Sequence, residues 1–316
     1  QDGPDTREQF ARAERLGQIV VGTEFQAHDA IDLVLAAGED DIERASLAER
    51  SFESVVADRS EPFHLIYVKN GGSASPDDFL ARRAEEGGFM LICPPQRLWP
   101  NQARNLALPH VRTEYVAFID NDVIVETGWL KTLVACADET RAALVGPMYF
   151  WSDGLSEPLI HMAGGTLTEI ETPQGTALHE HHERLNAPAS DRAQLRRGKC
   201  DFLEYHGMLA RTDFIRSLGG MNEEIVCVHE HIDIALEAKR AGLPVVFEPA
   251  AAITQLAFAP YLVSDLDFYR WRWNREAAER SLSAFLLKWN FVDDGEALKG
   301  IRGFVDSLTA NIDPLA

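Results

Sequence analysis

The sequence predicts an α/β fold with a mostly parallel central sheet flanked by helices and followed by a C-terminal helical tail. Short apolar runs rich in β-formers, such as Phe63–Val68 and Tyr115–Ile119, alternate with amphipathic segments such as Ala45–Asp58. Polar or glycine-rich turns follow the runs, as at Asn70–Ser73. This alternation is typical of βαβ units, whose ligand sites lie beyond the carboxyl ends of the strands.

The predicted elements follow a regular order. In the first half we expect strands at Ile19–Val21, Phe63–Val68, Phe89–Ile92, Tyr115–Ile119 and Leu144–Gly146, separated by helices at Ala45–Asp58, Pro76–Glu86, Asn101–Leu108 and Trp129–Ala137. The segment His28–Ala37 fits a strand or a helix. Beyond residue 150, turn residues predominate as far as Arg197; then we expect a strand at Leu203–Ala210, a helix at His229–Arg240, a strand at Val245–Phe247 and a tail that is helical to about Trp289.

Caps and breakers set several of these boundaries. Pro76 follows a Ser75 cap and begins a helix, because proline suits the first helical position. Pro94 closes the third strand. Gly242 and Pro244 end the helix that starts near His229.

One strand end carries the clearest chemical signal. The apolar run Tyr115–Ile119 stops at Asp120, Asn121 and Asp122. Two carboxylates one residue apart at such an edge can share a hard divalent cation through their oxygens, and the cation can neutralise phosphates. The alternative is an ordinary acidic turn, since Asp and Asn favour turns.

Composition limits the function classes. The 316 residues carry a formal net charge of −20, which opposes binding to nucleic acid or anionic membranes. The four cysteines are far apart and form no CxxC pair, which favours free thiols in a reducing, cytoplasmic compartment. No apolar run reaches about 18 residues, so we expect no membrane-spanning segment. An acidic enzyme that handles a nucleotide needs a metal or local basic groups at its site.

Five segments in order resemble the family 2 glycosyltransferases, whose GT-A fold is a single Rossmann-like α/β domain that binds a nucleotide sugar. They are the helix, strand and turn of Ser51–Ser73, the N-x-x-R-N helix of Asn101–Leu108, the D-x-D strand end of Phe118–Asp122, the GGMNEE turn within Leu218–Glu224, and the segment His229–Gln255. The resemblance runs from about Ile19 to Gln255, which is most of the chain.

The resemblance implies roles for individual residues. Asp120 would meet the ribose, and Asp122, with Asp120, would hold Mn²⁺ or Mg²⁺ at the diphosphate. Arg104 would reach a phosphate or a sugar hydroxyl, for which a guanidinium is suited; a structural salt bridge is the alternative. The other residues expected at the donor are Thr23, Glu24, Asn70, Asn101 and Asn121.

Two positions depart from the family pattern. Where relatives carry Glu-Asp, with the Asp as general base, this chain has Glu230 and His231, followed by Asp233. We expect Glu230, His231 and Asp233 at the catalytic centre, with Glu230 or His231 as the base; a retaining mechanism would need none. Gln255 stands where many relatives place a metal-binding His, so we expect it to be a weaker ligand.

Three further groups remain to be interpreted, and two of them are candidates for the acceptor side. His161 and His206 are expected to contact the sugar or to be structural, and Trp271 in the tail is expected to stack on a sugar or to pack on the core. The run His179–His182 has metal-ligand residue types, but adjacent positions on a loop rarely converge on one ion, so a mobile loop is favoured over a metal site.

Together these observations predict one GT-A domain over residues 1–258, with a nucleotide-binding half at about 18–125, an acceptor half at about 126–258 and a helical extension at 259–316. The predicted activity is metal-assisted transfer from a nucleoside diphosphate sugar, with UDP-sugars favoured, to a hydroxyl of a carbohydrate or other acceptor, with inversion. The alternatives are a degenerate nucleotide-sugar-binding module and a sugar-phosphate nucleotidyltransferase. The latter would need a basic Gly-rich loop near the first strand, and Gly22–Phe25 lacks one.

Overall fold

A computed structural model describes residues 31–37, 42–70, 79–152, 156–256, 270–272 and 274–296. The predicted strand at Ile19–Val21 and the predicted donor residues Thr23 and Glu24 lie outside this part of the chain.

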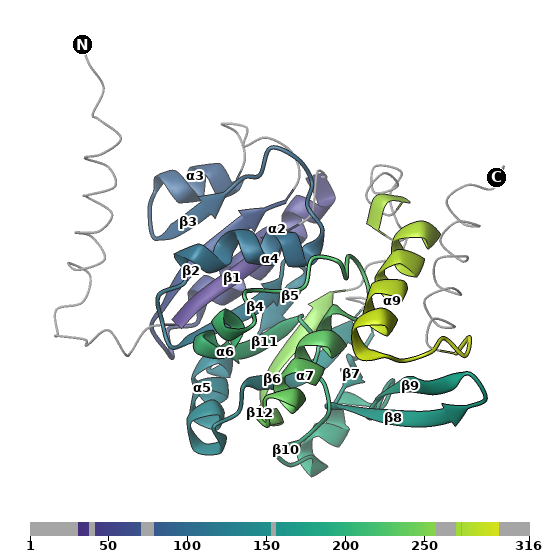
Figure 1. Ribbon diagram of the computed structural model, residues 1–316. Helices are drawn as coiled ribbons and strands as arrows, with labels where there is room; N and C mark the ends of the chain where they lie inside the picture. Colours follow the sequence, from purple (N-terminus) through teal and green to yellow (C-terminus); the bar gives the residue numbers. More distant parts are fainter. Residues whose placement is uncertain are drawn as a thin grey trace.

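Ten strands form one central sheet in the order β10-β12-β6-β11-β4-β1-β2-β3, with β5 paired to β12 and β7 paired to β6 (Figure 1). The strands are β1 (Ile31–Ala37), β2 (Phe63–Lys69), β3 (Phe89–Ile92), β4 (Tyr115–Asp120), β5 (Val123–Val125), β6 (Leu144–Ser152), β7 (Leu159–Met162), β10 (Gly198–Lys199), β11 (Gly207–Arg211) and β12 (Val245–Leu256). A separate hairpin joins β8 (Gly165–Thr172) to β9 (Gly175–His182).

The sheet is mixed, so the prediction of a mostly parallel sheet is wrong. β1 pairs in parallel with β2 and β4, β2 with β3, and β6 with β12. β11, however, lies between β4 and β6 and runs antiparallel to both. The described chain between β6 and β11 forms hairpins and a 3₁₀ helix instead of a crossover helix. It therefore re-enters the sheet from the edge at which β6 ended, which makes the next strand antiparallel.

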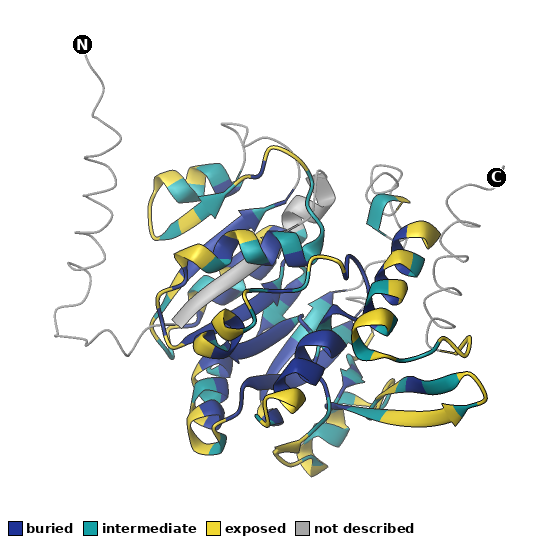
Figure 2. Ribbon diagram, viewed as in Figure 1, coloured by how far each residue is buried: buried dark blue, intermediate teal, exposed yellow. Residues whose placement is uncertain are grey.

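Helices cover the sheet and bury their apolar sides on it (Figure 2). They are α2 (Ile42–Ala57), α3 (Phe79–Glu85), α4 (Pro100–Ala107), α5 (Trp129–Thr140), α6 (Thr212–Ser217), α7 (Glu230–Arg240) and α9 (Arg275–Trp289), with 3₁₀ turns η1 (Leu108–His110) and η2 (Ala189–Gln194). The core is continuous from Phe52 on α2 through Phe118 on β4 to Phe285 on α9. Burial of this surface, at about 25 cal/mol per Å², is the main stabilising term.

Several further sequence expectations change on the structure; the strand expected at Leu203–Ala210, for example, is β11 and begins only at Gly207. The His179–His182 run is not a loop but the end of β9, paired in register with β8. The last predicted strand is longer than Val245–Phe247 and continues as β12 to Leu256, with an irregularity after Glu248. The longer β12 brings Gln255 next to Asp122, whose carboxylate it contacts.

The tail helix α9 docks on α7. Lys288 Nζ lies 2.7 Å from an oxygen of Asp233, and Trp289 Nε1 donates to the same carboxylate at 2.8 Å. Ser281 Oγ donates to the carbonyl of Val228 at 2.7 Å. Of the helices that the structure describes, none combines the length and apolarity needed to cross a membrane.

Candidate active site

The end of β4 places Asp120 opposite the start of β11. The Asp120 amide donates to the His206 carbonyl at 3.5 Å, and the His206 ring Nδ1 lies 2.7 Å from Asp120 Oδ2. Arg104 Nη2 approaches the other oxygen of Asp120 at 3.8 Å, and its guanidinium stacks on the Tyr205 ring, 3.7 Å from the centroid. Asp120 is therefore held from two sides by cationic groups.

The electrostatics make Asp120 and His206 an ion pair. Burial raises the pKa of a carboxyl group, but the hydrogen bond from His206 and the charges of His206 and Arg104 bring the pKa of Asp120 below its usual value. Burial likewise lowers the pKa of an imidazole, yet the hydrogen bond to Asp120 and the charges of Asp120, Glu204 and Asp122 together outweigh burial and raise the pKa of His206 to about 9. At neutral pH both groups are charged.

Asp122 has a different environment, set by the pairing of β5 with β12. Gln255 pairs with Val123 in that register, and its Nε2 donates to Asp122 Oδ2 at 3.2 Å. The second oxygen, Oδ1, is shielded from solvent and has no hydrogen-bond partner among the described residues. Burial, then the charge of Asp120, raises the pKa of Asp122 above its usual value.

This arrangement fits a hard divalent cation. A solvent-shielded carboxylate oxygen without a donor is costly unless a cation faces it. Asp120 lies two positions earlier in the chain, and Gln255 would present its amide oxygen to the same ion after a half-turn of the amide. Asp122, Asp120 and Gln255 are thus a suitable oxygen-donor set.

The asparagines predicted at the donor hold the scaffold together. Asn70 Nδ2 donates to the Leu98 carbonyl at 2.6 Å, and its Oδ1 accepts from the Leu98 amide at 2.7 Å. Asn101 Nδ2 donates to the Asn222 carbonyl at 2.8 Å while its Oδ1 accepts from Arg104 Nη1 at 3.1 Å. Both side chains are buried and position backbone segments and Arg104, whereas Asn121 Nδ2 is buried and has no partner among the described residues.

The start of α7 carries the predicted catalytic pair. Glu230 is buried and lies 3.5 Å from Arg272 Nη2 in the tail segment; Arg272 Nη1 donates to the Cys227 carbonyl at 2.7 Å. The same Arg272 contributes positive charge at Asp120. The tail therefore brings a cation to both the D-x-D edge and the start of α7.

His231 and Asp233, the other two predicted catalytic residues, contact charged groups other than Glu230. His231 Nε2 lies 3.6 Å from Glu204 Oε1 and 3.7 Å from Glu180 Oε2. Burial lowers its pKa, but these carboxylates outweigh burial and raise the pKa of His231 to about 9. Asp233 is committed to Lys288 and Trp289 on α9, so the structure brings it to the tail helix rather than to the predicted catalytic pair.

A cluster of imidazoles adjoins the D-x-D edge. The His161 ring, on β7, lies 5.5 Å from the His206 ring and 5.2 Å from the His182 ring, measured between centroids. Burial and the neighbouring His206 lower the pKa of His161 to about 4, so it is neutral. Glu204 is the carboxylate among them; burial raises its pKa, but the surrounding histidines, His231 first, bring it below the usual value.

Sequence reasoning missed Glu204 and did not assign His182 to the site. Glu204 precedes the predicted His206 by two residues, which was the one available signal. Among the tail residues, Trp271 stacks on Trp99 at 4.3 Å with an interplanar angle of 17°, and Arg97 lies 5.3 Å from its ring centroid. The structure thus shows Trp271 packed on the segment before α4.

Comparisons with known proteins agree with one another. The family model described as glycosyl transferase family 2 matches residues 43–217. The chain is 27% identical over 192 residues to the pre-mycofactocin glycosyltransferase of Mycobacterium tuberculosis, a match that covers 60% of this chain and 36% of that protein. The chain therefore spans about a third of the length of these curated relatives, which are found in two strains.

Similar folds occur among solved structures. GalNAc-T7, solved with UDP, GalNAc and Mn²⁺, has a TM-score of 0.57 and 13% identity, over 92% of this chain and 57% of the other. The mannosyltransferase PcManGT of Pyrobaculum calidifontis, in complex with GDP-Man and Mn²⁺, has a TM-score of 0.55 and 14% identity, over 97% of this chain and 76% of the other. At these identities the likeness shows the fold.

Proposed function

This chain belongs to glycosyl transferase family 2 and has a GT-A-like α/β fold, and on that premise we propose that it catalyses metal-assisted transfer of a sugar from a nucleoside diphosphate sugar to an acceptor hydroxyl. The observation that carries the proposal is Asp122: one carboxylate oxygen is shielded and without a donor, directly beside Asp120 and Gln255. A divalent cation bound there would supply Lewis-acid stabilisation of the leaving diphosphate.

The chain's own residues support the remaining steps. Arg104 and His206 fix the Asp120 carboxylate, so that it is oriented before the donor binds. Arg272 of the tail lies 3.5 Å from Glu230, and a cation at this place favours the binding of an anionic diphosphate. The tail segment packs on Trp99 through Trp271, which supports a role for the tail in closing the site.

We favour Glu230 as the general base. His231 is held in its charged form by Glu204 and Glu180, and an imidazolium cannot accept a proton. Glu230 would take the proton of the acceptor hydroxyl; the acceptor oxygen then bonds to the anomeric carbon as the bond from that carbon to the diphosphate oxygen breaks. Attack on the side opposite the leaving group inverts the anomeric configuration.

A UDP-sugar is the favoured donor. GalNAc-T7 was solved with UDP, and TarS of S. aureus, which has a TM-score of 0.50 to this chain, was also solved with UDP, whereas PcManGT was solved with GDP-Man. We further propose a nucleotide-binding half near residues 18–125, an acceptor half near 126–258, and a carbohydrate or other hydroxyl-bearing acceptor.

Release of nucleoside diphosphate tests this function. UDP-, GDP- and dTDP-sugars are incubated with the protein, Mn²⁺ and a panel of sugar acceptors, and the nucleotide products are separated by chromatography. We expect release from one nucleotide class, reduced about 100-fold or more in Asp122→Asn, because the cation-stabilised leaving group is lost. Binding of a donor without release from any class would contradict an active transferase and support a non-catalytic binding module.

A further inference from the structure

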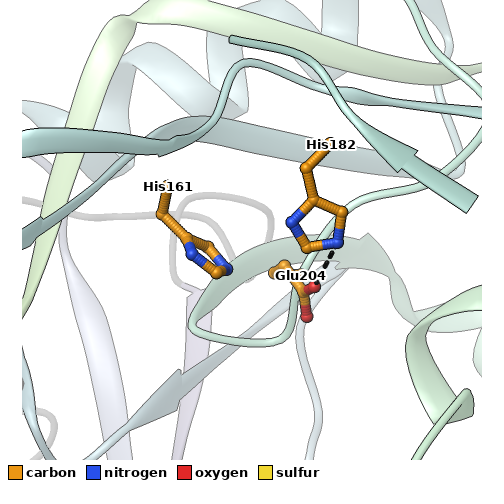
Figure 3. A group of neighbouring side chains, drawn as sticks. All are labelled: His161, His182 and Glu204. Atoms are coloured by element: carbon orange, nitrogen blue, oxygen red, sulfur yellow. Dashed lines mark ion pairs between the residues drawn. The ribbon is translucent and has the colours of Figure 1, made fainter. Parts of the chain in front are cut away.

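Three side chains outside the D-x-D edge converge on one point. His161 on β7, His182 at the end of β9 and Glu204 just before β11 each offer a ligand atom, and these atoms all lie within 4.8 Å of one another. Figure 3 shows the two imidazoles and the carboxylate pointing toward a common space from separate parts of the chain. All three side chains are half-buried.

The distance between His182 and Glu204 is long for a hydrogen bond and suits two ligands of one ion. His182 Nε2 lies 3.4 Å from Glu204 Oε1, whereas a charge-assisted bond brings such atoms to about 2.8 Å. Two ligands bound about 2.1 Å from a tetrahedral Zn²⁺ lie about 3.4 Å apart. The rings of His161 and His182 are almost perpendicular, at 84°, so they do not stack on each other.

We propose that His161, His182 and Glu204 bind a transition-metal ion of the Zn²⁺ class, at a site separate from the oxygen-ligated cation of Asp122. Two imidazole nitrogens and one carboxylate oxygen form a donor set that zinc accepts, whereas Mn²⁺ and Mg²⁺ prefer oxygen. Three protein ligands leave one coordination position open to water or to a ligand.

The backbone already holds these three segments together. The Gly165 amide donates to the Phe202 carbonyl at 3.1 Å and the Asp201 amide donates to the Gly165 carbonyl at 2.8 Å, and these bonds join the start of β8 to the segment just before Glu204. The Glu183 amide donates to the Gly164 carbonyl at 3.1 Å, next to His182. Little ordering is therefore needed for the ligands to meet.

The site would link the hairpin to the D-x-D edge. His161 contacts His206, and His206 is bonded to Asp120, so an ion on His161 fixes a ring that packs on the ion pair. A second group of ligand atoms, on Glu180, His182 and His231, shares His182 with this site, and in it Glu180 Oε2 lies 3.7 Å from His231 Nε2. The ion would thereby pin β9 against the sheet.

Cobalt binding tests the proposal without any donor or acceptor. The chain is freed of metal with EDTA, dialysed and titrated with Co²⁺, whose visible absorption reports nitrogen ligation. We expect one equivalent to bind with a visible band, Zn²⁺ to displace it, and affinity to fall at least tenfold in His182→Gln. His181→Gln is the matched control: His181 is exposed and adjacent, and the alternating strand directs it to the opposite face.

Two more variants keep the result interpretable. Glu204→Gln removes the carboxylate ligand and should weaken cobalt binding as His182→Gln does, with circular dichroism confirming that each variant is folded. Asp122→Asn should leave the cobalt band intact. The proposal is wrong if the wild-type chain gives no band, if folded His182→Gln and Glu204→Gln bind as tightly as wild type, or if Asp122→Asn abolishes the band. Failure of sugar transfer would change none of these outcomes.

Discussion

Asp120 and Asp122 are separated by one residue, yet the charges around their carboxylates differ. Asp120 is paired with His206 and Arg104, whereas Asp122 has a single neutral donor, Gln255, and one oxygen without any described partner. A carboxylate that already pairs with cations is stabilised less by binding a metal, so Asp122 is the stronger candidate for the metal ligand. Asp120 is the carboxylate whose orientation its partners fix more firmly.

The His206–Asp120 pair predicts a pH dependence of stability in the metal-free protein. The pKa of His206 is raised to about 9 in the folded chain, against about 6.5 when unfolded. A raised pKa stabilises the fold fully below about pH 6.5, and that contribution disappears as the pH rises through about 9. We expect wild type to exceed His206→Gln in Tm near pH 6, by a margin that shrinks toward pH 9.5.

Thermal unfolding in EDTA between pH 6 and pH 9.5 measures this margin. His181→Gln is the control, since that exposed residue should give a margin near zero at every pH. A margin for His206→Gln that stays constant or grows toward pH 9.5 would show that the pair does not contribute as an ion pair.

At the scale of elements, the turn after α6 is fixed to α4 by two side chains, Asn101, which donates to the Asn222 carbonyl, and Asn105. Asn105 Nδ2 donates to the Met221 carbonyl at 2.9 Å and to Glu223 Oε1 at 2.7 Å, and its Oδ1 accepts from the Met221 amide at 2.7 Å. Gly220 has φ of +110°, and a Cβ there would lie 2.8 Å from Asn105 Oδ1. The N-x-x-R-N helix and the Gly-Gly turn are therefore one structural unit.

We expect Asn105→Ala to lower the free energy of unfolding by about 2 kcal/mol, because the Met221 amide and carbonyl lose their partners. Glu223→Ala, which removes only the exposed bond, should change it by less than about 0.5 kcal/mol. Urea unfolding of both variants measures the difference. Equal losses of unfolding free energy in the two variants would mean that the bond to Glu223, and not the two bonds to the Met221 backbone, joins the two elements.

Asp233 binds two residues of the tail helix α9, Lys288 and Trp289, while Glu237 of α7 also pairs with Lys288, at 2.8 Å. We expect Asp233→Ala to lower the free energy of unfolding by about 2–3 kcal/mol, since Lys288 and Trp289 lose a buried carboxylate partner. The exposed Arg280–Glu224 pair, 3.9 Å apart, is the control, and Arg280→Ala should cost less than about 0.5 kcal/mol.

Urea unfolding and nucleotide release of Asp233→Ala are measured together. If the variant keeps its stability but loses activity, Asp233 belongs to the catalytic centre, as the sequence pattern indicated, and not to the attachment of α9.

At the scale of the whole molecule, local sequence patterns predicted the parallel strands of the sheet and the polar edge at which β4 ends. The run Tyr115–Ile119 followed by Asp120 is a short-range signal, since a buried strand and its polar end are adjacent in sequence. The orientation of β11 was not predictable in this way, because the chain from β6 returns through hairpins with no strong periodic pattern. A mixed sheet was therefore read as mostly parallel.

The histidine cluster illustrates the same limit at the site. His161, His182 and Glu204 are separated by 21 or more positions and meet only through the β8–β9 hairpin and the antiparallel β11. Adjacent residues His181 and His182 point to opposite faces, so the His-rich run looked unsuited to one ion although one of its members converges with distant residues. Non-local pairing set the site, and spacing along the chain did not reveal it.

The measurement that tests the central claim most directly is the melting temperature with UDP-, GDP- and dTDP-sugars, each with and without Mn²⁺, for wild type, Asp122→Asn and Glu169→Gln. Ligands that bind the folded state raise the Tm by mass action. We predict a Mn²⁺-dependent rise with one nucleotide class in wild type and in the exposed-carboxylate control Glu169→Gln, absent in Asp122→Asn. No rise with any nucleotide, or an undiminished rise in Asp122→Asn, would contradict a metal-assisted donor site at the end of β4.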